Sequence, residues 1–136
     1  MHSRAPRVEL GVVLVAAAAY VVVGLLTAAL AGRAATNHGT ITWRLVAWLL
    51  SLIIFVAHLA FSRRSRRLSV PIGAWNVALA VAVAAFVLAA VGPVRSHWRD
   101  AHMLRIAVSS LVAWPLLAGV PAFLVALLGG YMIDRA

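Results

Sequence analysis

The sequence contains no cysteine and no lysine, and its only acidic residues are Glu9, Asp100 and Asp134. The lack of cysteine excludes disulfide bonds, thiolate catalysis, cysteine-ligated metals and iron–sulfur clusters. None of the three acidic residues lies deep inside an apolar run. Ion-coupled transporters usually need a carboxylate within the membrane, so this pattern argues against that class.

Apolar residues are in large excess. They make up 65% of the 136 residues, and the mean hydropathy is +1.02, whereas soluble domains are about 45–50% apolar. Runs of Ala, Val and Leu without a period of two argue against a β-barrel. Because helices satisfy their own backbone hydrogen bonds in lipid, the sequence predicts an all-α membrane protein.

Four apolar runs are each long enough to cross a bilayer, which takes about 20 residues. We expect one domain over residues 1–136, built as a four-helix transmembrane bundle from two hairpins. The expected spans cover about 8–31, 43–61, 71–91 and 103–132. Polar residues 32–42 are expected to form a loop, and Gly92-Pro93 to end the third span. The first run exceeds the 7–15 residues of a signal-peptide core, so retention is favoured over cleavage.

Arginine is the dominant charged residue, with twelve copies and a net charge of +9. Four of them, Arg63, Arg64, Arg66 and Arg67, follow the second span. Arginine-rich short loops stay in the cytoplasm, so we expect both termini there, in a bacterial cytoplasmic (inner) membrane. The cluster is expected to bind anionic lipid headgroups. Nucleic-acid binding is not expected, because the other arginines are scattered over separate loops.

The fourth run is the longest and contains Pro115, Gly119 and Pro121. Proline removes a backbone donor and clashes one turn back, so a kink is predicted near Pro115 and Pro121. Ser109 and the adjacent Ser110 lie close enough in sequence to bond to the carbonyl of Leu111 that Pro115 frees. Serine more commonly bonds to its own helix. Together with Trp114 beside the first proline, these residues make the fourth helix a candidate functional element.

His58 is the one ionisable side chain clearly inside a span. Such a residue is a functional candidate by default, but its nearness to the arginine cluster also fits a structural histidine at the interface. Haem needs two ligands at similar depth on facing helices, and the other histidines lie elsewhere. His97 and His102 are five apart, which does not suit a helical metal site. We therefore expect no cofactor and no metal.

Small residues recur at four-residue spacing in three of the spans, which allows helix backbones to approach closely in a membrane. Packing within the chain is the favoured use of these faces, and an interface with a partner helix is the alternative. The packing candidates are Ala16, Gly24, Ala28, Ala78, Ala82, Ala122, Ala126 and Gly130.

No set of residues with catalytic spacing emerges. The leading hypothesis is therefore a small non-catalytic membrane protein, an accessory or structural subunit or a homo-oligomer. The alternative is a small oligomeric transporter or channel that uses the kinked fourth helix. A third hypothesis is a lipid-modifying membrane enzyme with His58 or His102 as base.

Overall fold

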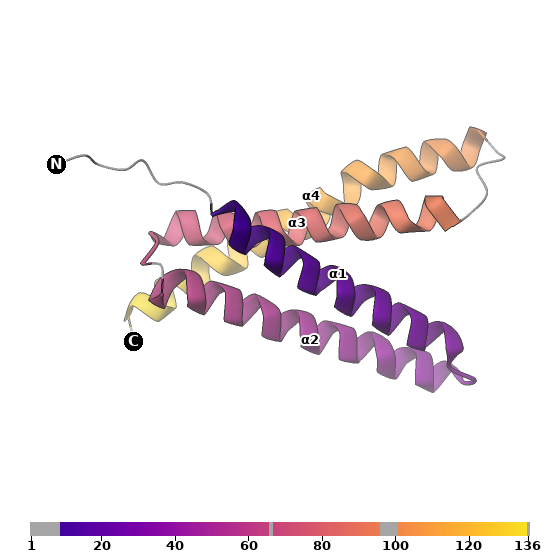
Figure 1. The fold of residues 1–136 in the computed structure, drawn as a ribbon, viewed down its shortest axis with the longest axis horizontal. Coiled ribbons are helices and arrows are strands. Elements are labelled where there is room, and N and C mark those ends of the chain that lie inside the picture. The colour runs from indigo at the N-terminus through magenta and orange to yellow at the C-terminus, as the bar shows by residue number, and fades with distance from the viewer. Residues whose placement is uncertain (1–8, 66, 96–100, 136) are drawn as a thin grey trace.

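The computed structural model describes residues 9–65, 67–95 and 101–135, and the side chains of these residues outside 92–104. This part of the chain is all helical and contains α1 (Leu10–Arg33), α2 (Asn37–Arg64), α3 (Val70–Arg95) and α4 (Ala101–Arg135) (Figure 1). All four helices are long and apolar enough to cross a membrane. The predicted set of four long apolar helices is therefore confirmed.

Several helix limits differ from the predicted ones. α2 begins at Asn37 rather than near residue 43, because the Thr36 hydroxyl accepts a hydrogen bond from the Gly39 N–H at 3.1 Å and caps the helix. The predicted loop over 32–42 is therefore wrong for most of its length. α3 continues through Gly92 and Pro93 to Arg95, since one proline in a last turn removes only one hydrogen bond. α1 and α4 also extend beyond the expected limits, to Arg33 and Arg135.

α3 is the central helix. Its backbone packs closely against α4 and α1 and, over a shorter stretch, against α2. Among the described residues, α1 and α4 do not approach each other closely, and α2 meets α4 only briefly. In Figure 1 the α1–α2 and α3–α4 hairpins lie together where α2 leads into α3 and diverge toward Arg33 and Arg95. We call the first region the arginine end and the other the open end.

Two clusters of buried apolar residues hold the hairpins together. In the first, Val13, Ala16, Ala17 and Tyr20 of α1 pack against Ala80 and Ala84 of α3. In the second, Leu59 of α2 packs with Ala74 and Val77 of α3 and Ala126 of α4. Alanine at these contacts allows close approach, and van der Waals packing then stabilises helix association in lipid.

Most large apolar side chains point outward. Trp48 is 78% exposed, Met132 72% and Leu117 68%, and similar side chains occur along all four helices. In water such a surface would aggregate, whereas lipid tails cover it without cost. The helices and this surface together indicate a membrane protein.

Candidate functional site

A layer of buried polar side chains lies between α2 and α3 near the arginine end. Ser62 of α2 lies beside Gly73 of α3, where a Cβ added to Gly73 would be 3.8 Å from the Ser62 Cβ. Because α2 and α3 are antiparallel, residues that lie one turn away from this contact, toward the middle of each helix, are at the same depth. His58 and Asn76 are reached in this way, and Ser62, His58 and Asn76 are all buried.

Three polar atoms of this layer have no hydrogen-bond partner among the described residues. Within the described part of the chain, both ring nitrogens of His58 and the Oδ1 atom of Asn76 make no hydrogen bond. The hydroxyl of Tyr20 on α1, in the cluster with Ala80 and Ala84, is also buried without a partner there. Burying a polar group without a hydrogen bond costs about 2–7 kcal/mol. Unpaired polar groups of this kind are expected at functional or strained sites, which makes this layer a candidate site.

Arg63 closes the arginine end. Its guanidinium donates hydrogen bonds to the Leu68 carbonyl and to a carboxylate oxygen of Asp134. One side chain thus joins the end of α2, the segment before α3 and the end of α4. The connection turns sharply at Arg67, whose φ of 49° is in the left-handed region. This ion pair brings together residues 71 apart in sequence, and hydropathy alone does not reveal it.

The predicted lipid-binding arginines have different surroundings. Arg63 is mostly buried and occupied by its contacts within the protein, while Arg64 and Arg67 are exposed. Arg66 lies outside the described residues. Lipid binding stays a prediction, and Arg64 and Arg67 are the described residues free to serve it.

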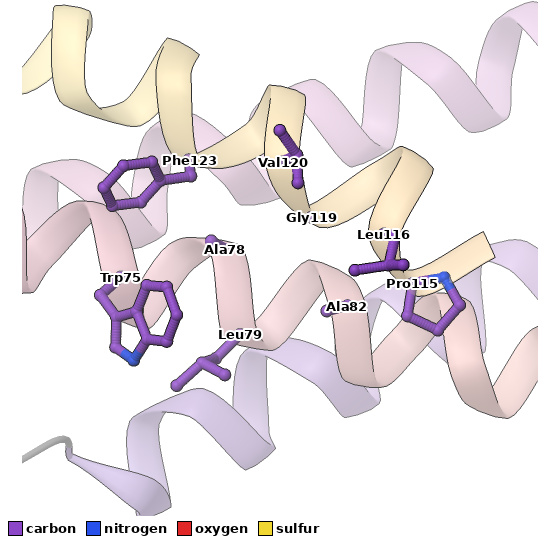
Figure 2. Close-up of a pocket in the computed structure, with 9 residues that line it drawn as sticks. All are labelled: Trp75, Ala78, Leu79, Ala82, Pro115, Leu116, Gly119, Val120 and Phe123. Carbon is purple, nitrogen blue, oxygen red and sulfur yellow. The ribbon is translucent and has the colours of Figure 1, made fainter. Parts of the chain in front are cut away.

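α3 and α4 cross at small residues (Figure 2). A Cβ added to Gly119 would lie 3.2 Å from the Ala82 Cβ and 3.6 Å from the Ala78 carbonyl oxygen. Figure 2 shows Gly119 directly above these two alanines, with Pro115 and Leu116 on one side of the crossing. Gly119 lies between the two prolines at which the sequence predicts a kink, and here it allows the two backbones to pack closely.

An apolar cavity of about 210 Å³ follows this crossing. At one end the rings of Trp75 and Phe123 meet edge to face, with centroids 5.9 Å apart and an interplanar angle of 82° (Figure 2). Such aromatic pairs contribute about 0.5–1.5 kcal/mol beyond their buried area. Pro115 lines the opposite part of the cavity.

The other candidates on α4 are less enclosed. Pro115 and Pro121 both lie inside one continuous helix, so the predicted kink stays a prediction. The Ser109 hydroxyl donates to the Ile106 carbonyl at 2.9 Å, and Ser110 donates to Ala107 at 2.7 Å. The suggestion that they reach the carbonyl freed by Pro115 is therefore wrong, since each hydroxyl bonds within its own turn. Trp114 is exposed.

The predicted packing residues divide into three groups. Ala16, Ala78, Ala126 and Gly130 are buried, and a Cβ on Gly130 would lie only 2.7 Å from Cγ1 of Val70. Gly24 packs against Leu88 across the α1–α3 contact, and Ala82 and Ala122 are half-buried. Ala28 is exposed. Most of these small faces are thus used inside the chain.

The described residues contain no cluster of three or more histidine, aspartate or glutamate side chains that could hold a metal ion. His97 lies outside the described residues, and the side chain of His102 is also not described. No protein family, curated protein or solved structure matches this chain.

Proposed function

We propose that this protein is a small non-catalytic membrane protein that acts by packing against another membrane protein or a second copy of itself. The observation that carries this proposal is the open arrangement of the helices. In a closed four-helix bundle, each helix packs against two neighbours around a shared core. Here α2 meets α4 only briefly within the described residues, and α3 supplies most of the contacts between hairpins.

The surfaces of α2 and α4 support the same proposal. α4 exposes large apolar side chains along its length, among them Leu117, Val125 and Leu128. The divergence of the hairpins toward the open end leaves parts of α2 and α4 without a helix from the other hairpin (Figure 1). A transmembrane helix of a partner matches such a surface in length and polarity, and packing with it needs no catalytic group.

The mass of the protein purified in mild detergent and in lipid nanodiscs tests this proposal. We expect a multiple of the 14.4 kDa chain mass or a stoichiometric complex with another membrane protein. Because the chain lacks cysteine, single cysteines can locate the contact. Leu117→Cys should cross-link to a neighbour and Val77→Cys, which is buried, should not. An isolated monomer under all conditions would contradict the proposal.

The exposed arginines suggest how the protein is oriented. We propose that the arginine end and both termini face the cytoplasm of a bacterial cell, with Arg64 and Arg67 near anionic headgroups, because clustered arginines are retained on that side. Ser65 and His38 are both exposed and mark the two ends of α2. With single cysteines at these positions, intact cells should be labelled at residue 38, and residue 65 should react only after permeabilisation. The reverse pattern would show the opposite orientation.

A carrier or channel is the second candidate, favoured by the position of Pro115 beside the cavity at the α3–α4 crossing. If α4 bends there during transport, Pro115→Ala restores a hydrogen bond and stiffens the helix. We expect this variant to fold with equal or higher thermal stability. Its transport rate, or its rate of partner exchange, should fall severalfold. Pro121→Ala, at an exposed position, is the matched control. A change in thermal stability alone would assign Pro115 to packing.

A further inference from the structure

A second cavity lies at the open end, between α1 and α2. Its volume is about 430 Å³, within the range of about 300–1,000 Å³ typical of ligand sites. Small residues of α1 form one wall, and Thr40, Trp43 and Arg44 of α2 form the other. The lining residues on α1 are Gly24, Thr27, Ala28, Ala31 and Gly32.

The depth of Arg44 follows from the hairpin geometry. The Thr40 hydroxyl oxygen lies 3.4 Å from the Ala31 carbonyl oxygen, and at the same distance from the Thr36 carbonyl of its own helix, so Thr40 and Ala31 lie side by side. Arg44 is one turn after Thr40 on α2, and Thr27 is one turn before Ala31 on α1. Arg44 and Thr27 therefore lie at the same level. Arg44 is seven residues from the start of α2, or about 10 Å at 1.5 Å per residue. If α2 begins at the membrane surface, this depth is near the boundary between headgroups and hydrocarbon, since each headgroup region is about 6 Å thick.

The described part of the chain does not neutralise the charge of Arg44. Within the described residues no carboxylate pairs with it, and the acidic side chain of Asp134 is engaged by Arg63 at the other end. Helical side chains tilt toward the N-terminus of their helix, so Arg44 reaches toward the membrane surface at the open end. The cavity therefore has a cation at its polar side and a smooth apolar wall below it.

We propose that this cavity binds one anionic phospholipid of the leaflet at the open end. The guanidinium of Arg44 contacts the lipid phosphate, because arginine forms paired, charge-assisted hydrogen bonds with phosphate. Trp43 lies at headgroup depth, where amphipathic aromatic rings are enriched. One acyl chain lies along the groove lined by Ala28 and Ala31. The exposed Ala28, which lines this cavity, would thus contact the lipid.

Bromine quenching of a protein whose only tryptophan is Trp43 tests this proposal, with the other tryptophans changed to phenylalanine. Brominated phosphatidylglycerol should quench Trp43 fluorescence saturably, and brominated phosphatidylcholine should do so only weakly. Arg44→Gln should weaken phosphatidylglycerol binding about fivefold or more, the contribution of one basic residue near an anionic surface. Arg105→Gln removes the same charge from an exposed position on α4 and should change little.

The acyl chain is tested separately. Ala28→Leu fills the groove and should weaken binding, whereas Ala29→Leu, at the next exposed position outside the cavity, should not. Soluble glycerol phosphate should not displace the lipid at equal concentration. Unchanged binding by Arg44→Gln, equal quenching by phosphatidylcholine, or full displacement by glycerol phosphate would each overturn the proposal.

Discussion

Replacing Gly119 with leucine is expected to separate α3 from α4 and to destabilise the protein by about 2 kcal/mol or more. Overpacking a close contact typically costs about 1–3 kcal/mol. Here even a single Cβ would lie 3.2 Å from the Ala82 Cβ and 3.6 Å from the backbone oxygen of Ala78. The backbone of α3 cannot move aside without disturbing its contacts with α1 and α2. Thermal unfolding in detergent and the yield of monodisperse protein measure the effect.

Two further variants calibrate this result. Ala113→Leu adds the same bulk at an exposed position on α4 and should melt near the wild-type temperature. Gly119→Ala adds only the Cβ, so a small shift of a few tenths of an ångström in α4 can accommodate it, and its effect should lie between the other two. Gly119→Leu melting like Ala113→Leu would show that the helices do not cross at this residue.

The second large effect is expected from reversing the charge of Asp134. In Asp134→Arg, the mostly buried Arg63 faces another cation instead of its carboxylate partner. Leaving a buried charge unpaired is costly, although the partial exposure of Asp134 reduces the loss to about 1–2 kcal/mol. The same thermal assay should show a lower melting temperature. Asp134→Asn, which removes the pairing without repulsion, should have a smaller effect.

Exchange of the two charges distinguishes the ion pair from other causes. The double variant Arg63→Asp with Asp134→Arg should recover part of the lost stability, so the two single effects should not add. Strict additivity would mean that the residues do not interact. Because Arg63→Asp also lowers the positive charge of the loop, labelling of a cysteine at Ser65 should confirm that the orientation is unchanged.

Hydropathy was sufficient to predict four helices, but not their limits. The stretch after Thr36 contains Asn37, His38 and Gly39, whose composition is typical of a turn, yet it forms the first turn of α2 under the Thr36 cap. Proline gave a similar error at the end of α3, where Pro93 lies inside the helix. In both places residues that are typical of a turn are part of a helix that continues beyond its apolar segment.

The candidate site was harder to predict, because hydropathy does not determine how each helix is rotated about its axis. His58 could be recognised as a polar residue inside a span, but its pairing in depth with Asn76 depends on the α2–α3 register. The packing role of Gly119 and the Arg63–Asp134 pair depend on how the second hairpin docks. One signal was present, since Asp134 follows the fourth span and is therefore expected on the same side of the membrane as the arginine cluster.

The central position of α3 determines the order in which the protein can assemble during synthesis. Ribosomes add about 5–20 residues per second, so the α1–α2 hairpin exists for seconds before α3 has been made. Until then Tyr20, Leu59 and the neighbouring alanines lack the surface that buries them. A membrane chaperone or a partner helix therefore has the best access to these residues while only the first hairpin has been inserted. If the chain is split within residues 65–69 and the two halves are coexpressed, they should therefore assemble through the contacts of α3 with the first hairpin.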